Sequence, residues 1–156
     1  MKSILFAFVL IPIASVSCPL EGYWKSNEEM TLESMKKAEG LTEPQLNLFS
    51  NNFFGKLYLK IECNKFVSVY EDWIETTEYT LISFNENEVV TKYFSDVEGE
   101  VEKTSKLEGK CYSMGVLNDK FKEYFCPIGE SDFEAAIEES LNLKSLQESE
   151  NESCKK

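Results

Sequence analysis

Hydrophobic and polar residues alternate most clearly between Lys56 and Glu62, where Leu57, Leu59 and Ile61 share one face. A period of two residues predicts a β-strand with one buried face. Further segments rich in aromatic and β-branched residues follow, separated by turn-forming residues. Together with residues 22–25 and 56–62, the predicted strands are 66–70, 76–84, 89–94, 101–107, 111–117 and 121–128. About eight strands joined by short turns predict a mainly β fold, an antiparallel up-and-down β-barrel.

A helical period replaces this alternation between the first two predicted strands. Ser26 and Glu29 fit a capping box that begins one helix, and Gly40 is a typical helix end. Thr42 and Gln45 fit a second capping box, and that helical pattern runs to the glycine at position 55. We expect a helix-turn-helix insert whose apolar side packs on the barrel. Its apolar residues are Met30, Leu32, Met35, Leu46, Phe49 and Phe53.

Helical spacing returns after the last predicted strand. Phe133, Ile137 and Leu141 lie on one helical face, which predicts a C-terminal helix from Asp132 to about Ser145, packed outside the barrel. Residues 147–156 contain few apolar side chains, and we expect them to form a flexible acidic tail.

The first 17 residues differ from the rest of the chain. They combine Lys2, an apolar run from Ile4 to Ile13 and small residues just before Cys18, a pattern typical of a secretory signal. The apolar run is too short for a membrane span. We therefore expect an exported protein, periplasmic or secreted. In a second interpretation Cys18 carries a lipid, which is the only membrane attachment that we expect.

Charge and composition narrow the classes of function. The chain has 28 acidic residues, 16 basic residues and no histidine, for a net charge of -12. This charge repels phosphate backbones, so we expect no nucleic-acid partner, whereas a basic protein partner is compatible with it. Without histidine the commonest hydrolase and metal-site designs are excluded. We predict a non-catalytic protein with no cofactor and no metal site.

Cysteines in an exported chain indicate disulfides. The hairpin of the last two strands places Cys111 opposite Cys126, which makes this pair the first choice. A bridge from Cys63 to one of them stays open as an alternative. Cys18 and Cys154 lie near the two ends of the processed chain and form a second candidate pair.

The segment Gly22-Tyr23-Trp24, followed by Lys25, resembles the Gly-x-Trp signature of the calycin superfamily, which includes lipocalins and fatty-acid-binding proteins. Residues 22–40 also resemble the first strand and helix of fatty-acid-binding proteins, whose helical pair covers the mouth of the barrel. The resemblance implies one calycin-like barrel domain over residues 18–146, with structural roles for Gly22 and Trp24. Fatty-acid-binding proteins hold a carboxylate with arginine, and all basic residues of this chain are lysine.

Two functions fit these observations. In the first, the barrel carries a small apolar molecule beneath the helical lid. In the second, the protein is a periplasmic or secreted inhibitor or immunity protein that binds and neutralises a basic protein. The candidate ligand-binding residues are either core or cavity lining, and they are Met35, Leu46, Phe49, Phe53, Tyr58, Tyr79 and Tyr93.

Overall fold

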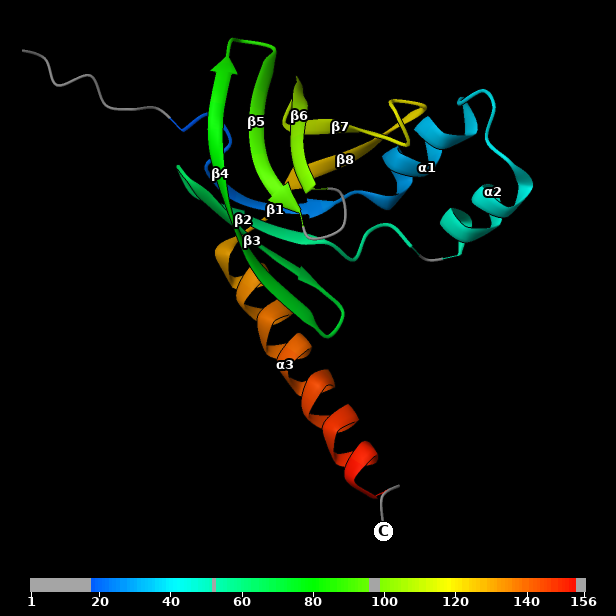
Figure 1. The fold of residues 1–156 in the computed structure, drawn as a ribbon, viewed down its shortest axis with the longest axis vertical. Coiled ribbons are helices and arrows are strands. Elements are labelled where there is room, and N and C mark those ends of the chain that lie inside the picture. Colours follow the sequence, from blue (N-terminus) through cyan, green and yellow to red (C-terminus); the bar gives the residue numbers. More distant parts are fainter. Residues whose placement is uncertain (1–17, 52, 96–98, 154–156) are drawn as a thin grey trace, which may run out of the picture.

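Antiparallel strands close into a barrel over the residues that the computed structural model describes, which are 18–51, 53–95 and 99–153. Each strand pairs with the next along the chain, and the first strand pairs with the eighth. This arrangement, shown in Figure 1, confirms the predicted up-and-down barrel. The strands are β1 (Gly22–Ser26), β2 (Tyr58–Ile61), β3 (Lys65–Tyr70), β4 (Trp73–Phe84), β5 (Glu88–Ser95), β6 (Gly99–Glu108), β7 (Cys111–Val116) and β8 (Phe121–Pro127). The helices are α1 (Glu28–Lys36), α2 (Glu43–Ser50) and α3 (Glu130–Ser153).

Inward-facing side chains of several strands form the core of the barrel. The alternation predicted for β2 is confirmed, because Leu59 and Ile61 are buried in this core while Tyr58 faces the other side of the sheet. Burial of apolar area stabilises such a core by about 25 cal/mol per Å² removed from water. The buried core residues are Leu20, Leu59, Ile61, Val89, Tyr112 and Phe125.

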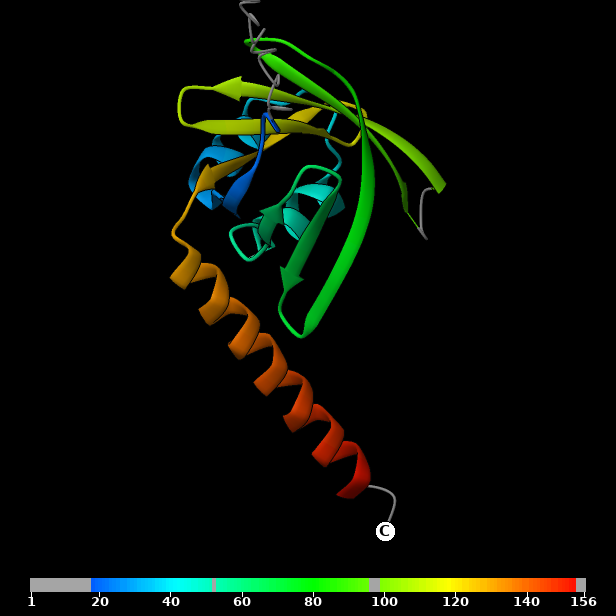
Figure 2. The ribbon, with the colours of Figure 1, turned by 90° about the vertical axis from the view of Figure 1, so that its left-hand side faces the viewer.

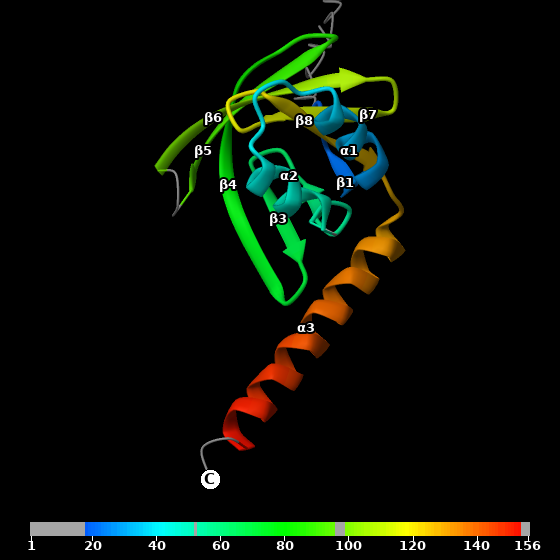
Figure 3. The same ribbon diagram turned by 90° about the vertical axis from the view of Figure 1, so that its right-hand side faces the viewer.

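Helix α1 lies against β8 (Figure 3), and residues of both helices join a cluster with Phe121 at the start of β8. Met35 of α1 and Phe49 of α2 are buried in a second cluster with Phe54 and Phe121. The ring centroids of Phe49 and Phe121 lie 5.6 Å apart in an edge-on arrangement, which is favourable for aromatic pairs. The prediction that the apolar side of the insert packs on the barrel is confirmed.

Helix α1 also completes the seam between the first and last strands. The β1–β8 ladder uses residues 24–26 of β1. Beyond it, the Thr31 hydroxyl accepts a hydrogen bond from the Tyr124 amide at 3.1 Å, and the Ser34 hydroxyl accepts one from the Lys122 amide at 2.9 Å. A buried amide without a partner costs free energy. The helix therefore substitutes for a strand along this part of β8.

The start of α1 differs from the prediction, whereas the start of α2 agrees with it. Asn27 caps α1 by accepting a hydrogen bond from the Met30 amide at 3.0 Å. Ser26 does not cap the helix because it is the last residue of β1. The capping box of Thr42 and Gln45 at the start of α2 is confirmed. Both helices end before the predicted glycines, α1 at residue 36 and α2 at residue 50.

The C-terminal helix is longer than predicted. It begins at Glu130 and runs to Ser153, so the expected tail from residue 147 continues as helix as far as the described chain goes. The helix is free of glycine and proline and rich in Glu, which favours helix. No helix in the described chain is long and apolar enough to cross a membrane.

Only the first half of α3 packs on the barrel. Phe133 and Ala136 are buried against Val69 of β3, and the ring centroids of Phe133 and Tyr23 lie 5.6 Å apart. The second half projects away from the strands (Figure 2). Packing outside the barrel is therefore confirmed for the first turns of the helix.

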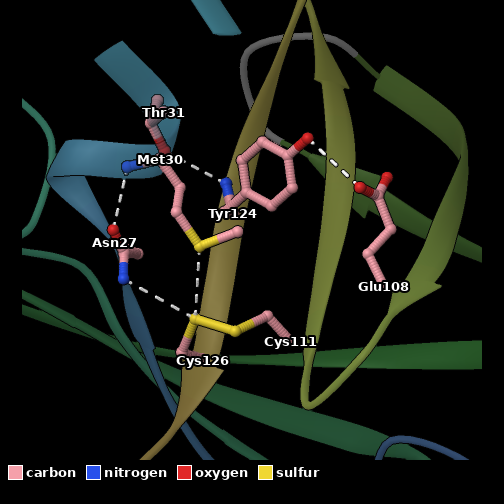
Figure 4. The surroundings of a disulfide bond; sticks show 7 residues. All are labelled: Asn27, Met30, Thr31, Glu108, Cys111, Tyr124 and Cys126. Atoms are coloured by element: carbon pink, nitrogen blue, oxygen red, sulfur yellow. Dashed lines mark hydrogen bonds between the residues drawn. A yellow bond between two sulfur atoms is a disulfide. The ribbon is translucent and has the colours of Figure 1, made fainter. Parts of the chain in front are cut away.

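Two disulfides join parts of the barrel. Cys111 on β7 and Cys126 on β8 form the predicted cross-strand bond beneath α1, where the sulfurs of Cys126 and Met30 lie 3.9 Å apart (Figure 4). Cys18 pairs with Cys63. This pair corrects three alternatives: lipidation of Cys18, its bond to the last cysteine, and a bond from Cys63 to the β7–β8 hairpin. Cys154 and the predicted signal sequence (1–17) lie outside the described residues.

Candidate ligand-binding site

A cavity of about 510 Å³ lies inside the barrel. Sites for small molecules have volumes of about 300 to 1,000 Å³. Inward-facing residues of β2 to β7 supply most of the lining, as the alternation of strands requires. The apolar lining includes Leu57, Leu59, Ile61, Phe66, Leu81, Val89 and Met114.

Residues before β1 close one end of this cavity. Leu20 is buried and lines the cavity, and its carbonyl accepts a hydrogen bond from the Trp24 indole at 2.9 Å. The Cys18–Cys63 disulfide ties this segment to the β2–β3 turn. Trp24 packs edge-on against Tyr112, with ring centroids 4.9 Å apart. Trp24 therefore holds the closed end together.

The cavity is open where β4 and β5 diverge. β5 pairs with β4 only through residues 79–84 of β4, so residues 73–78 pair with β3 alone. Trp73 and Phe94 line the cavity here and are 48% and 68% exposed. Val89, deeper in the cavity, is 1% exposed. The two aromatic side chains therefore mark the mouth.

Polar side chains lie among the apolar lining. The Tyr79 hydroxyl donates to the Glu62 carbonyl at 2.6 Å, so this tyrosine is already paired within the protein. Burial raises the pKa of both Tyr79 and Tyr112, and it raises that of Tyr112 well above its ordinary value. Lys103 and Ser105 of β6 also line the cavity.

A carboxylate faces the barrel interior next to the cavity. Glu123 of β8 lies opposite Met114 of β7, which lines the cavity. The Ser26 hydroxyl donates to the Glu123 carboxylate at 2.7 Å. Burial raises the pKa of Glu123, and this hydrogen bond opposes the rise. The protein thus holds an acid in a poorly hydrated position without an ion pair among the described residues.

Two of the predicted ligand-binding residues line the cavity, and a third does not. Tyr79 and Tyr93, opposite each other on β4 and β5, both line it. Tyr58 instead packs outside the barrel near α3, with the Lys25 ammonium 4.7 Å from its ring centroid. This correction follows from strand alternation, because the leucines at 57 and 59 point inward and force Tyr58 outward.

The two helices of the predicted lid lie away from the lining of this cavity. Met35 and Phe49 are buried in the cluster beside β8, and Leu46 and Phe53 are 37% and 40% exposed. None of these four residues, and no other residue of α1 or α2, lines the cavity. The physical reason is the aromatic cluster around Phe121, which draws the insert to β8. Gly22 and Trp24 both lie in β1, where Gly22 pairs with Ile61 of β2.

Sequence reasoning missed the polar lining on β6. Lys103 and Ser105 lie between Val101 and Leu107 on the inward face of β6, and exposed residues alternate with these four positions. That alternation was the available signal. It was obscured because lysine and serine at inward positions imitate an exposed strand.

Metal binding finds little support in the described residues. The ligand atoms of Cys18, Glu21 and Cys63 lie within 4.8 Å of one another. Both sulfurs belong to a disulfide, however, and the thiolate is the form that binds metals.

The described geometry is that of a barrel with an apolar cavity, one closed end and an aromatic mouth. The resemblance of its first strand to calycins stays a prediction. Comparison of this chain with family models, with curated proteins and with solved structures finds no match.

Proposed function

We propose that this protein is a non-catalytic binding protein that holds a small, largely apolar molecule inside its barrel. The observation that carries the proposal is the cavity of about 510 Å³, lined mainly by apolar side chains. An apolar ligand that enters such a site removes its own surface and that of the lining from water. The barrel wall is already formed, so little conformational ordering opposes binding.

Export of the protein is part of this proposal. Two disulfides are consistent with an oxidising compartment. A binding protein in the cell envelope or outside the cell meets apolar molecules that water dissolves poorly, and an enclosed cavity shields them.

The test uses a neutral fluorescent probe, N-phenyl-1-naphthylamine, and native mass spectrometry of the purified chain. At a binding free energy of about −0.3 kcal/mol per non-hydrogen atom, the probe binds with about −5 kcal/mol in total. This corresponds to a Kd on the order of 0.2 mM. Ser105→Phe places a ring in the cavity, and we expect at least a tenfold weaker Kd. Thr104→Phe is the matched control, because Thr104 is exposed and absent from the lining.

Circular dichroism and thermal melting of both variants establish that they fold. Equal probe affinity of folded Ser105→Phe and the wild type contradicts binding in the cavity. Absence of both probe binding and a co-purifying molecule contradicts the proposed function as a whole.

A second candidate function is binding of a basic protein, as an inhibitor or immunity protein does. The observation that favours it is α3, whose projecting second half extends from a barrel that already carries excess negative charge. Such a charge distribution speeds encounter with a cationic partner.

The test measures association of the full chain with purified cationic cell-wall hydrolases at low and high salt. Glu148→Gln on the projecting half of α3 should slow association, and Glu86→Gln on the β4–β5 turn is the control.

A further inference from the structure

Polar side chains of two neighbouring strands form one part of the cavity wall. Lys103 and Ser105 of β6 and Tyr112 of β7 line it, and we name these three residues the polar row. β2 lies across the eight-stranded barrel from β6 and contributes Leu59 and Ile61, beside Ser68 of β3. A ligand that fits both walls therefore carries its polar atoms along one side.

The members of the polar row are neighbours by strand register. Lys103 and Ser105 are two residues apart on one strand, so their Cα atoms are about 7 Å apart on the same face. Ser105 lies opposite Met114 on β7, and Tyr112 is two residues further along that strand on the same face. Thr91 lies opposite Lys103 and also lines the cavity. A cation and three hydroxyls thus occupy adjoining positions.

Protein groups leave the polar row available for a ligand. Ser105 is 2% exposed and Tyr112 is 1% exposed. Across the described residues, the hydrogen bonds of the protein involve neither hydroxyl, and the ion pairs do not involve the Lys103 ammonium. Ser105 and Tyr112 both line the cavity, so a ligand with matching oxygen atoms can accept hydrogen bonds from their hydroxyls.

We infer that the ligand is an apolar molecule that carries one anionic group and at least one further oxygen atom along its body. The anionic group lies at Lys103, the further oxygen atom accepts hydrogen bonds from Ser105 and Tyr112, and the apolar side faces β2. This inference rests on the proposed function and specifies the ligand class of the same cavity. Glu75 lines the cavity from β4, at the mouth, so its negative charge lies on another part of the wall.

The test displaces the neutral probe with a matched pair of anions, stearate and 10-hydroxystearate, which differ by one hydroxyl group. Wild-type protein should bind 10-hydroxystearate about threefold to tenfold more tightly than stearate, because its extra hydroxyl oxygen accepts hydrogen bonds from the polar row. Ser105→Ala and Tyr112→Phe should each reduce the ratio of the affinity for 10-hydroxystearate to the affinity for stearate.

Lys103→Met removes the charge and keeps the length of the side chain. The substitution should weaken binding of both anions by about tenfold or more, because hydrogen bonds to charged groups are the strong ones. Affinities of both anions are measured by competition with the neutral probe, and circular dichroism and thermal melting establish that the variant folds. Lys106→Met, at an exposed position on the same strand, is the matched control and should bind as the wild type does.

The outcomes separate the two proposals. If Lys103→Met binds both anions as tightly as the wild type and the neutral probe still binds, the inference of an anionic ligand is overturned. The proposed function as a binding protein for a small apolar molecule then stands. Equal affinity of the wild type for stearate and 10-hydroxystearate overturns the inference that the ligand carries a further oxygen atom. If no variant and no wild-type protein binds the probe or either anion, both proposals fail.

Discussion

Removal of the Cys18–Cys63 disulfide should destabilise the protein more than removal of Cys111–Cys126. A disulfide restricts the unfolded chain, and the entropy that it removes grows with the logarithm of the loop length. The Cys18–Cys63 bond spans 45 residues and the Cys111–Cys126 bond spans 15. In the chain-entropy relation these loops correspond to about 4 and about 3 kcal/mol at 25 °C.

Packing increases the difference between the two bonds. The Cys18–Cys63 disulfide holds Leu20, which is 6% exposed in the barrel core. Release of this segment exposes part of the core. The loss of unfolding free energy should therefore be at least as large as the value that chain entropy alone gives. The cross-strand bond joins strands that their hydrogen-bond ladder already holds in register.

The assay is urea unfolding of the oxidised protein and of two double variants, Cys18→Ala/Cys63→Ala and Cys111→Ala/Cys126→Ala. Tryptophan fluorescence and circular dichroism report the transition, and coincidence of the two signals establishes that unfolding is a single cooperative step. A smaller loss for the first variant than for the second contradicts the reasoning. So does a loss below about 1 kcal/mol for the first, which lies at the low end of the range for disulfides.

Two further predictions concern the barrel and its C-terminal helix. Glu123→Gln should stabilise the protein at pH 7, because burial raises the pKa of this carboxyl in the folded state and its charged form is therefore disfavoured there. The gain should shrink as the pH falls from the raised pKa of Glu123 toward the ordinary value of 4.5, and urea unfolding between pH 4 and pH 8 measures it; a gain independent of pH contradicts the assignment. Phe133→Ala should cost about 3 to 5 kcal/mol of unfolding free energy because the ring is buried against β3, whereas Leu141→Ala, at a side chain that is 56% exposed, should cost less than about 0.5 kcal/mol. Thermal melting of the two variants checks this difference, and equal losses mean that α3 does not pack as described.

Local patterns in the sequence were sufficient for the strands and the cross-strand disulfide. The period of two between residues 56 and 62, with turn formers between later strands, specifies strand number and order because neighbours in the chain pair in space. The hairpin register placed Cys111 opposite Cys126 for the same reason. Long-range packing was not accessible in this way. The pairing of Cys18 with Cys63 depends on how the segment before β1 enters the barrel.

The candidate site was predicted only in part. Tyr79 and Tyr93 were found because aromatic residues on strands line many cavities. The lid was predicted from amphipathic helices, but amphipathicity indicates only that a face is buried and not against which partner. The cluster of Phe54 and Phe121 decided that partner. Lys103 was missed because a charged residue suggests solvent, and only the closed sheet turns it inward.

The seam between β1 and β8 limits how this chain can be re-engineered. A minimal barrel made by excising residues 27–57 and joining β1 directly to β2 loses the hydroxyls of Thr31 and Ser34. The amides of Lys122 and Tyr124 then face an unpaired edge, which is a template for pairing with another molecule. A shortened scaffold therefore needs a replacement cap for the last strand, or it will associate edge to edge.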